Sequence, residues 1–103
     1  MSILTPTEAA TVLRCEIDDQ NMLDLLEQVT AFVENATGWK WSQDTVINAS
    51  AKSAARMLLV QWFENPSQTG SENGAPLTFG LNAVLLQLKA EAVRLKELEE
   101  LEA

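Results

Sequence analysis

Residues 47–65 read INASAKSAARMLLVQWFEN, and this stretch decides the fold. The alanines of its first half allow close helix packing, and its second half supplies bulk. We expect a helix that starts near Asp44 or Thr45, ends at Asn65 before Pro66, and forms the centre of the core. Its apolar residues recur at helical spacing and make one wide stripe: Ile47, Ala51, Ala54, Ala55, Leu58, Leu59, Trp62 and Phe63.

A short helix is predicted at the N-terminal end of the chain. Thr5 can cap it, Pro6 suits the first helical position, and Glu8 completes a capping box. The acidic residues at 16–19 follow. They lack the glycine and the spaced oxygen ligands of a calcium loop, so we interpret them as a solvated turn that caps the next helix.

A second helix should run from about Gln20 or Asn21 to Ala36, and Gly38 is a natural residue to end it. Its apolar residues step by four and three, which stacks them on one broad face. These residues are Met22, Leu25, Leu26, Val29, Phe32, Val33 and Ala36.

The last helix is expected from about Leu81, with a coiled-coil-like seam at Leu81, Leu85, Leu88, Ala92 and Leu95. Beyond it the chain is acidic, and only Lys96 offsets the glutamates. Acidic residues at a helix C-terminus oppose the macrodipole, so this end should fray unless a partner holds it. We therefore expect a helical domain over residues 1–95 and an acidic tail over 96–103 that is ordered on assembly.

Two segments between the helices stand out. Residues 66–76 combine two prolines, two glycines and polar residues, which predicts a long exposed loop. Trp39-Lys40-Trp41 alternates apolar and polar residues, a pattern that allows a short strand or hairpin with both indoles on one face. The two tryptophans either form a contact surface or cover the end of the core. The expected fold is an all-α bundle of about four helices.

The composition excludes several classes of function. The chain has 103 residues, 15 acidic and 7 basic, and a formal charge of −8. Such a surplus disfavours a grip on the phosphate backbone of nucleic acids and on anionic membranes. The first residues have no basic region before an apolar core, so we expect no signal peptide.

The chain also lacks the usual means of catalysis. It has no histidine and a single cysteine. Cys15 is therefore interpreted as a structural thiol, because no histidine base is present to activate it. No paired-carboxylate signature or phosphate-binding glycine loop is visible. We expect no enzymatic activity, no cofactor and no metal.

Residues 54–86 resemble the small head–tail connector (adaptor, head completion) proteins of long-tailed bacteriophages. The resemblance rests on the helix AARMLLVQWFEN at 54–65, a polar loop, and LTFGLNAVLL at 77–86. The opening helix, the acidic turn and the second helix resemble the corresponding parts of that family, so the similarity spans about residues 3–90. The family signature falls on Trp62, Phe63, Glu64, Asn65, Phe79, Leu85 and Leu86, for which a structural role is expected.

This resemblance implies a structural virion protein of the phage neck. About a dozen copies would form a ring beneath the portal protein, extend the DNA channel, and offer a platform to the next neck protein, a stopper or tail terminator. DNA would pass through the lumen without specific binding, and no membrane is involved. The protein would act in the virion, at the head–tail junction, after assembly in the host cytoplasm.

Ring formation requires two different patches that meet between neighbours. The candidate interface residues are Trp39, Trp41, Pro66, Gly70, Gly74, Leu95, Leu98 and Leu101. The alternative function is a small acidic helical module that acts as a monomer on a basic partner, an interpretation that the glutamate tail and the net charge also fit.

Overall fold

The computed structural model describes residues 2–64 and 79–102, and within them the predicted all-α fold is confirmed. Helix α1 spans Pro6–Leu13 and α2 spans Gln20–Thr37. A 3₁₀ turn, η1, covers Trp41–Gln43, followed by α3 at Ala49–Glu64 and α4 at Phe79–Glu102. The loop predicted at 66–76 lies outside the described residues.

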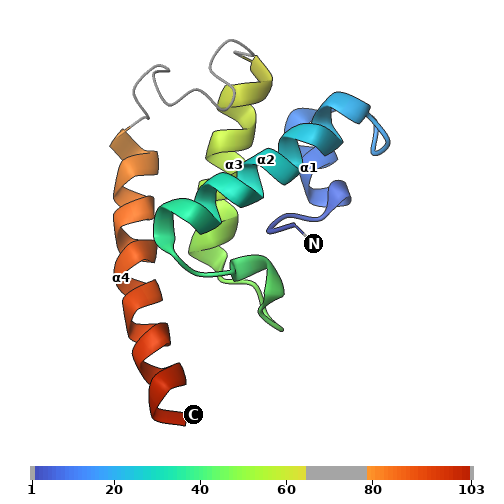
Figure 1. Cartoon of the computed structure of the whole chain (residues 1–103). Coiled ribbons are helices and arrows are strands. Elements are labelled where there is room, and N and C mark those ends of the chain that lie inside the picture. The colour runs from blue at the N-terminus through green and yellow to red at the C-terminus, as the bar shows by residue number, and fades with distance from the viewer. Residues whose placement is uncertain (1, 65–78, 103) are drawn as a thin grey trace.

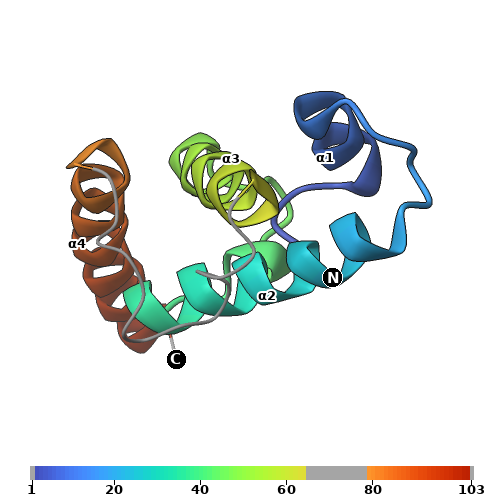
Figure 2. The same cartoon turned by 90° about the horizontal axis from the view of Figure 1, so that it is seen from above.

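The helices form two layers. Helix α2 crosses beneath α1, α3 and α4, which lie side by side across it (Figures 1 and 2). Helix α3 lies between α1 and α4 and contacts both of them as well as α2. The central position expected for this helix is therefore confirmed.

Local capping explains where the first two helices begin and end. Thr5 Oγ1 accepts a hydrogen bond from the Glu8 N–H at 3.1 Å, and Glu8 Oε1 accepts one from the Thr5 N–H at 2.9 Å. Asp19 Oδ1 accepts from the Met22 N–H at 2.9 Å, which confirms that the acidic turn caps α2. Gly38 ends α2 in the left-handed conformation, with φ of 86°.

Helix α3 begins later than predicted. Its cap is Asn48, whose Oδ1 accepts hydrogen bonds from the N–H groups of Ser50 and Ala51, at 2.7 and 3.2 Å. Asp44, the expected start, instead closes η1 with its own N–H bonded to the Trp41 carbonyl at 3.3 Å. The prediction of a start at Asp44 or Thr45 was therefore wrong by one helical turn.

The core is a single cluster of apolar side chains from the four described helices and their connections. The predicted seam of α4 is confirmed, because Leu81, Leu88 and Ala92 are buried and Leu85 and Leu95 pack against the core. The chain before α1 also contributes, since Ile3 and Leu4 are fully buried. The Ile3 N–H donates to Thr30 Oγ1 at 3.1 Å, which fixes this segment to α2.

Candidate functional site

The segment after α2 is a compact corner rather than a strand. Residues 41–43 form η1, so the predicted strand or hairpin over 39–43 is wrong. The physical reason is Gly38: its left-handed backbone turns the chain back along α2, and no second strand in the described residues offers a partner. The Gly38 N–H still bonds the Glu34 carbonyl at 2.8 Å.

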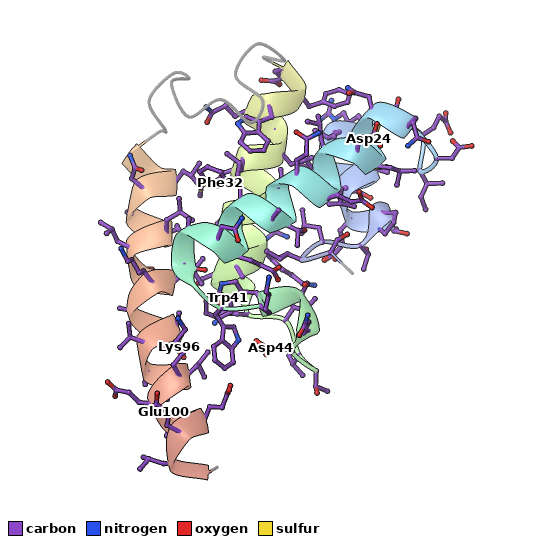
Figure 3. The ribbon with its side chains drawn as sticks, in the orientation of Figure 1. Asp24, Phe32, Trp41, Asp44, Lys96 and Glu100 are labelled. Carbon is purple, nitrogen blue, oxygen red and sulfur yellow. The ribbon has the colours of Figure 1, made fainter. Side chains whose placement is uncertain are left out.

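The two tryptophans of this corner have different environments. Trp41, labelled in Figure 3, is fully buried. Its Nε1–H donates to Thr37 Oγ1 at 2.8 Å. Trp39 is half-buried, and its Nε1–H is shared between the two carboxylate oxygens of Asp44 at 3.2 and 3.1 Å. The ring centroids are 6.4 Å apart. Trp41 thus covers the end of the core, and only Trp39 offers surface for contact.

A buried carboxylate holds the corner to α2. Glu34 is 8% exposed, and its Oε2 accepts hydrogen bonds from the Ser42 N–H at 3.0 Å and the Ser42 hydroxyl at 2.7 Å. The sequence reasoning missed this residue. Its position in the helix could have indicated that it is buried. Glu34 lies four residues after Thr30 and next to Val33, on the buried face of α2.

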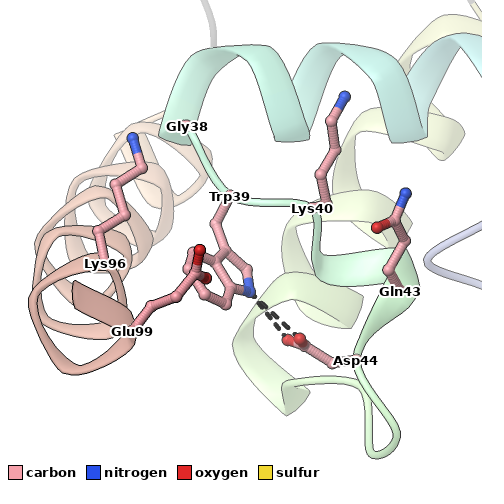
Figure 4. A pocket seen from close by; sticks show the side chains of 7 residues that line it. All are labelled: Gly38, Trp39, Lys40, Gln43, Asp44, Lys96 and Glu99. Atoms are coloured by element: carbon pink, nitrogen blue, oxygen red, sulfur yellow. Dashed lines mark hydrogen bonds between the residues drawn. The ribbon is translucent and has the colours of Figure 1, made fainter. Parts of the chain in front are cut away.

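The C-terminal half of α4 meets this corner. A pocket of about 370 Å³ lies between them, lined by Gly38, Trp39, Lys40, Gln43, Asp44, Lys96 and Glu99 (Figure 4). Lys96 and Lys40 lie on opposite sides of Trp39 in this view, and the side chains of both point toward α2. The structure therefore brings together Trp39 and the last helix, two of the three regions predicted to form an interface.

Helix α4 is apolar on two opposite faces. Its seam is buried, but Leu86 and Val93 are 68% and 54% exposed. Leu86 and Val93 are seven residues apart and therefore lie on one face. Leu86 and the buried Leu88 are two residues apart and therefore lie on opposite sides of the helix. Near the C-terminal end, Leu98 and Leu101 are exposed as well. We call Leu86, Lys89 and Val93 the outer face of α4.

The acidic end belongs to the same helix, since α4 continues without a break past Leu95 to Glu102. Glu97, Glu99 and Glu100 are all exposed there. The expectation that this end frays without a partner stays a prediction.

The residues of the family signature separate into interior and exterior positions. Trp62 is buried and packs edge-to-face on Phe32, with ring centroids 5.5 Å apart. Phe63 and Leu85 pack against the core, whereas Glu64 is exposed at the end of α3 and Leu86 points outward. Phe79 is the first residue of α4. Asn65, Pro66, Gly70 and Gly74 lie outside the described residues.

Two ion pairs and one free thiol lie among the described residues. The Thr5 N–H and the Lys52 ammonium, which is 2.9 Å from Glu8 Oε2, hold the pKa of Glu8 below its usual value. Arg94 pairs with Glu91 and lowers the pKa of that carboxyl group. Burial raises the pKa of the Cys15 thiol, which keeps it protonated and weakly nucleophilic.

Over residues 2–64 and 79–102, no group of three or more His, Cys, Asp or Glu side chains could hold a metal ion. None of the helices in that same part of the chain is long and apolar enough to span a membrane.

Comparisons of the chain with protein-family models, with curated proteins and with solved structures find no match.

Proposed function

We propose that the protein is a structural subunit of the bacteriophage neck, which assembles as a ring beneath the portal protein. The observation that carries this proposal is the outer face of α4, where Leu86 and Val93 are exposed although the opposite side of the helix already packs in the core. An apolar face of this kind on a small domain is typical of a surface that is covered by another protein.

The acidic end of α4 supports the same role. The helix that carries the apolar outer face also carries three exposed glutamates, Glu97, Glu99 and Glu100. A ring with a surplus of negative charge would let DNA slide through without holding its phosphates, because binding would require cationic side chains. We expect part of this charge to face the channel and the C-terminal part to meet a basic surface of a neighbouring neck protein.

Such a subunit binds and positions other proteins and catalyses no reaction. It requires no cofactor, and its partners are further copies of itself, the portal protein, and the next neck protein. About a dozen copies would extend the DNA channel, and the protein would be found at the head–tail junction of the virion.

The proposal is tested by mixing the chain with purified portal rings of the same phage and examining the mixture by native mass spectrometry and negative-stain microscopy. We expect a ring of this protein stacked on the portal. The double variant Leu86→Glu/Val93→Glu should lose the ring, whereas Val46→Glu should keep it, because Val46 is exposed on the connection before α3. Free monomer beside bare portal in the wild-type mixture would contradict the proposal.

A second candidate is the monomeric acidic module, which the three exposed glutamates of α4 favour. It predicts salt-sensitive capture of a basic partner by the isolated chain. A pull-down from host lysate at low and high salt, with Glu97, Glu99 and Glu100 replaced by Gln as the control, separates the two functions. Capture that requires these glutamates, without ring formation on the portal, favours the module.

A further inference from the structure

A second exposed apolar position lies at the other end of the molecule. Ile17 is 53% exposed in the connection between α1 and α2. This connection and α4 lie on opposite sides of the molecule in both views (Figures 1 and 2). Exposed aliphatic side chains therefore lie on both of these sides of the molecule.

The connection that carries Ile17 is a fixed turn. The Asp19 N–H bonds the Glu16 carbonyl at 3.1 Å, so Ile17 and Asp18 are the two central residues of the turn and lie at its tip. Asp19 is in turn held as the cap of α2. A tip that is already ordered loses little conformational freedom when it binds.

Lys89 gives the outer face of α4 a charge opposite to that of the turn. Glu16 and Asp18, on either side of Ile17, are both exposed. At the other end, Lys89 is exposed between Leu86 and Val93, three residues after the first and four before the second, and so lies on the same face. Each surface thus places exposed aliphatic and charged side chains side by side, with opposite signs.

From this we infer that the acidic turn at residues 16–18 of one copy docks on the outer face of α4 of the next copy. Ile17 would pack against Leu86 and Val93, and Glu16 and Asp18 would flank Lys89. Because the two surfaces differ and lie at opposite ends, the contact is head-to-tail, and its repetition produces a closed ring or an open filament. The inference rests on the proposed function, for which it names the two surfaces that join neighbouring subunits.

A single contact of this kind is small. A turn on one helix face buries less than the roughly 1,000 Å² that a stable pairwise interface needs. Isolated copies should therefore associate weakly, and closure of the ring, or a template that gathers the copies, supplies the stability through multiple simultaneous contacts.

Cysteine cross-linking tests the contact in the full chain, with Cys15→Ser as background. The variant Ile17→Cys/Val93→Cys, oxidised at high protein concentration with and without portal rings, should give a ladder of dimers, trimers and larger species on a non-reducing gel. Each single variant should stay monomeric, because a head-to-tail contact does not bring two copies of the same residue together. The matched control is Val46→Cys/Val93→Cys, which replaces the turn by another exposed valine.

A ladder from the 17/93 pair that exceeds the control by roughly tenfold supports the contact. Equal yields from the two pairs, or a covalent dimer from Val93→Cys alone as strong as the 17/93 product, overturn it, since the latter indicates symmetric pairing of α4. The two proposals fail separately. Rings on the portal without the 17/93 cross-link overturn the contact only, whereas the ladder without portal binding contradicts the neck function only.

Charge exchange gives an independent readout. Glu16→Lys/Asp18→Lys and Lys89→Glu should each associate roughly tenfold more weakly than the wild type when tested alone by analytical ultracentrifugation. An equimolar mixture should regain association, because each altered turn then meets an altered helix of opposite charge. A mixture that associates no better than its components overturns the inference.

Discussion

The ammonium nitrogen of Lys96 lies against Gly38: a Cβ atom added at residue 38 would come within 2.9 Å of that nitrogen. Helix α2 has no basic residue in its own last turn, so Lys96 is the cation that α4 places beside the negative end of the α2 dipole. The pair connects the C-terminal half of α4 to the corner that holds Trp39 (Figure 4).

Replacing Gly38 should therefore destabilise the protein for two reasons. Gly38→Ala forces a side chain into a left-handed conformation, which costs about 1–2 kcal/mol, and it displaces Lys96. Gly80→Ala is the matched control, because it is helical and a Cβ there meets nothing within 4 Å, so it should be neutral or stabilising. Urea unfolding of both variants measures the difference. Equal stability of the two variants would contradict the role assigned to Gly38.

Removing the charge of Lys96 should cost about 0.5–1 kcal/mol at low salt and less at high salt. Lys96→Met keeps the length of the side chain, and Lys89→Met, on the outer face of α4, is the control that should leave stability unchanged. Lys96→Met and Gly38→Ala disturb the same contact. The sum of their separate losses in free energy of unfolding should therefore exceed the loss in the double variant. Strict additivity in this cycle would show that the two residues act separately.

Glu34 should be the most sensitive charged residue of α2. Glu34→Ala leaves the Ser42 N–H and hydroxyl without their buried acceptor and should cost about 2–3 kcal/mol. Glu34→Gln keeps one acceptor oxygen and should cost less. Glu27→Ala, at an exposed position of the same helix, controls for helix propensity. Urea unfolding gives the stabilities, and near-ultraviolet circular dichroism should report the loosened tryptophans in Glu34→Ala. An unchanged spectrum would contradict a role for Glu34 in fixing the corner.

Glu8 should contribute to the fall in the free energy of unfolding as the pH becomes acidic. The folded-state pKa of Glu8 is lowered, first by the Thr5 N–H and then by Lys52, so its stabilisation is present above the unfolded-state pKa. It is lost as the pH falls through the lowered folded-state pKa, below the ordinary glutamate pKa of about 4.3. The difference in free energy of unfolding between wild type and Glu8→Gln should thus be largest near pH 7 and disappear in strong acid. In a Lys52→Met background this difference should become smaller but persist, because the Thr5 N–H still lowers the pKa of Glu8. A difference that does not change with pH would contradict this role of Glu8.

Sequence patterns within a few residues were sufficient for the helices. The capping box at Thr5 and Glu8, the cap at Asp19 and the stop at Gly38 act through hydrogen bonds between near neighbours, so they could be read directly. The later start of α3 was missed because Asp44 and Asn48 are both good caps, and the bonds of the 39–44 corner decided between them.

The candidate site depended on contacts between distant parts of the chain. The sequence placed Trp39 and Trp41 in one motif, but their separation into surface and core follows from Asp44 on one side and Thr37 on the other. It also predicted a buried seam on α4 without revealing that Leu86 and Val93 face outward. The spacing predicted the seam, but α4 carries apolar residues around much of its circumference. Only the packing of α2 and α3 on one side of α4 leaves Leu86 and Val93 uncovered.

The sequence by itself determined the helical class, most helix ends and the apolar seam, because those depend on spacing and capping within one or two turns. Only the tertiary structure decided what meets what: Ile3 with Thr30, Lys52 with Glu8, and Lys96 with Gly38. These pairs are separated by many residues along the chain, and no local rule specifies them. They form because α2 crosses the other three described helices (Figure 2). That crossing leaves the outer face of α4 and the tip at Ile17 exposed.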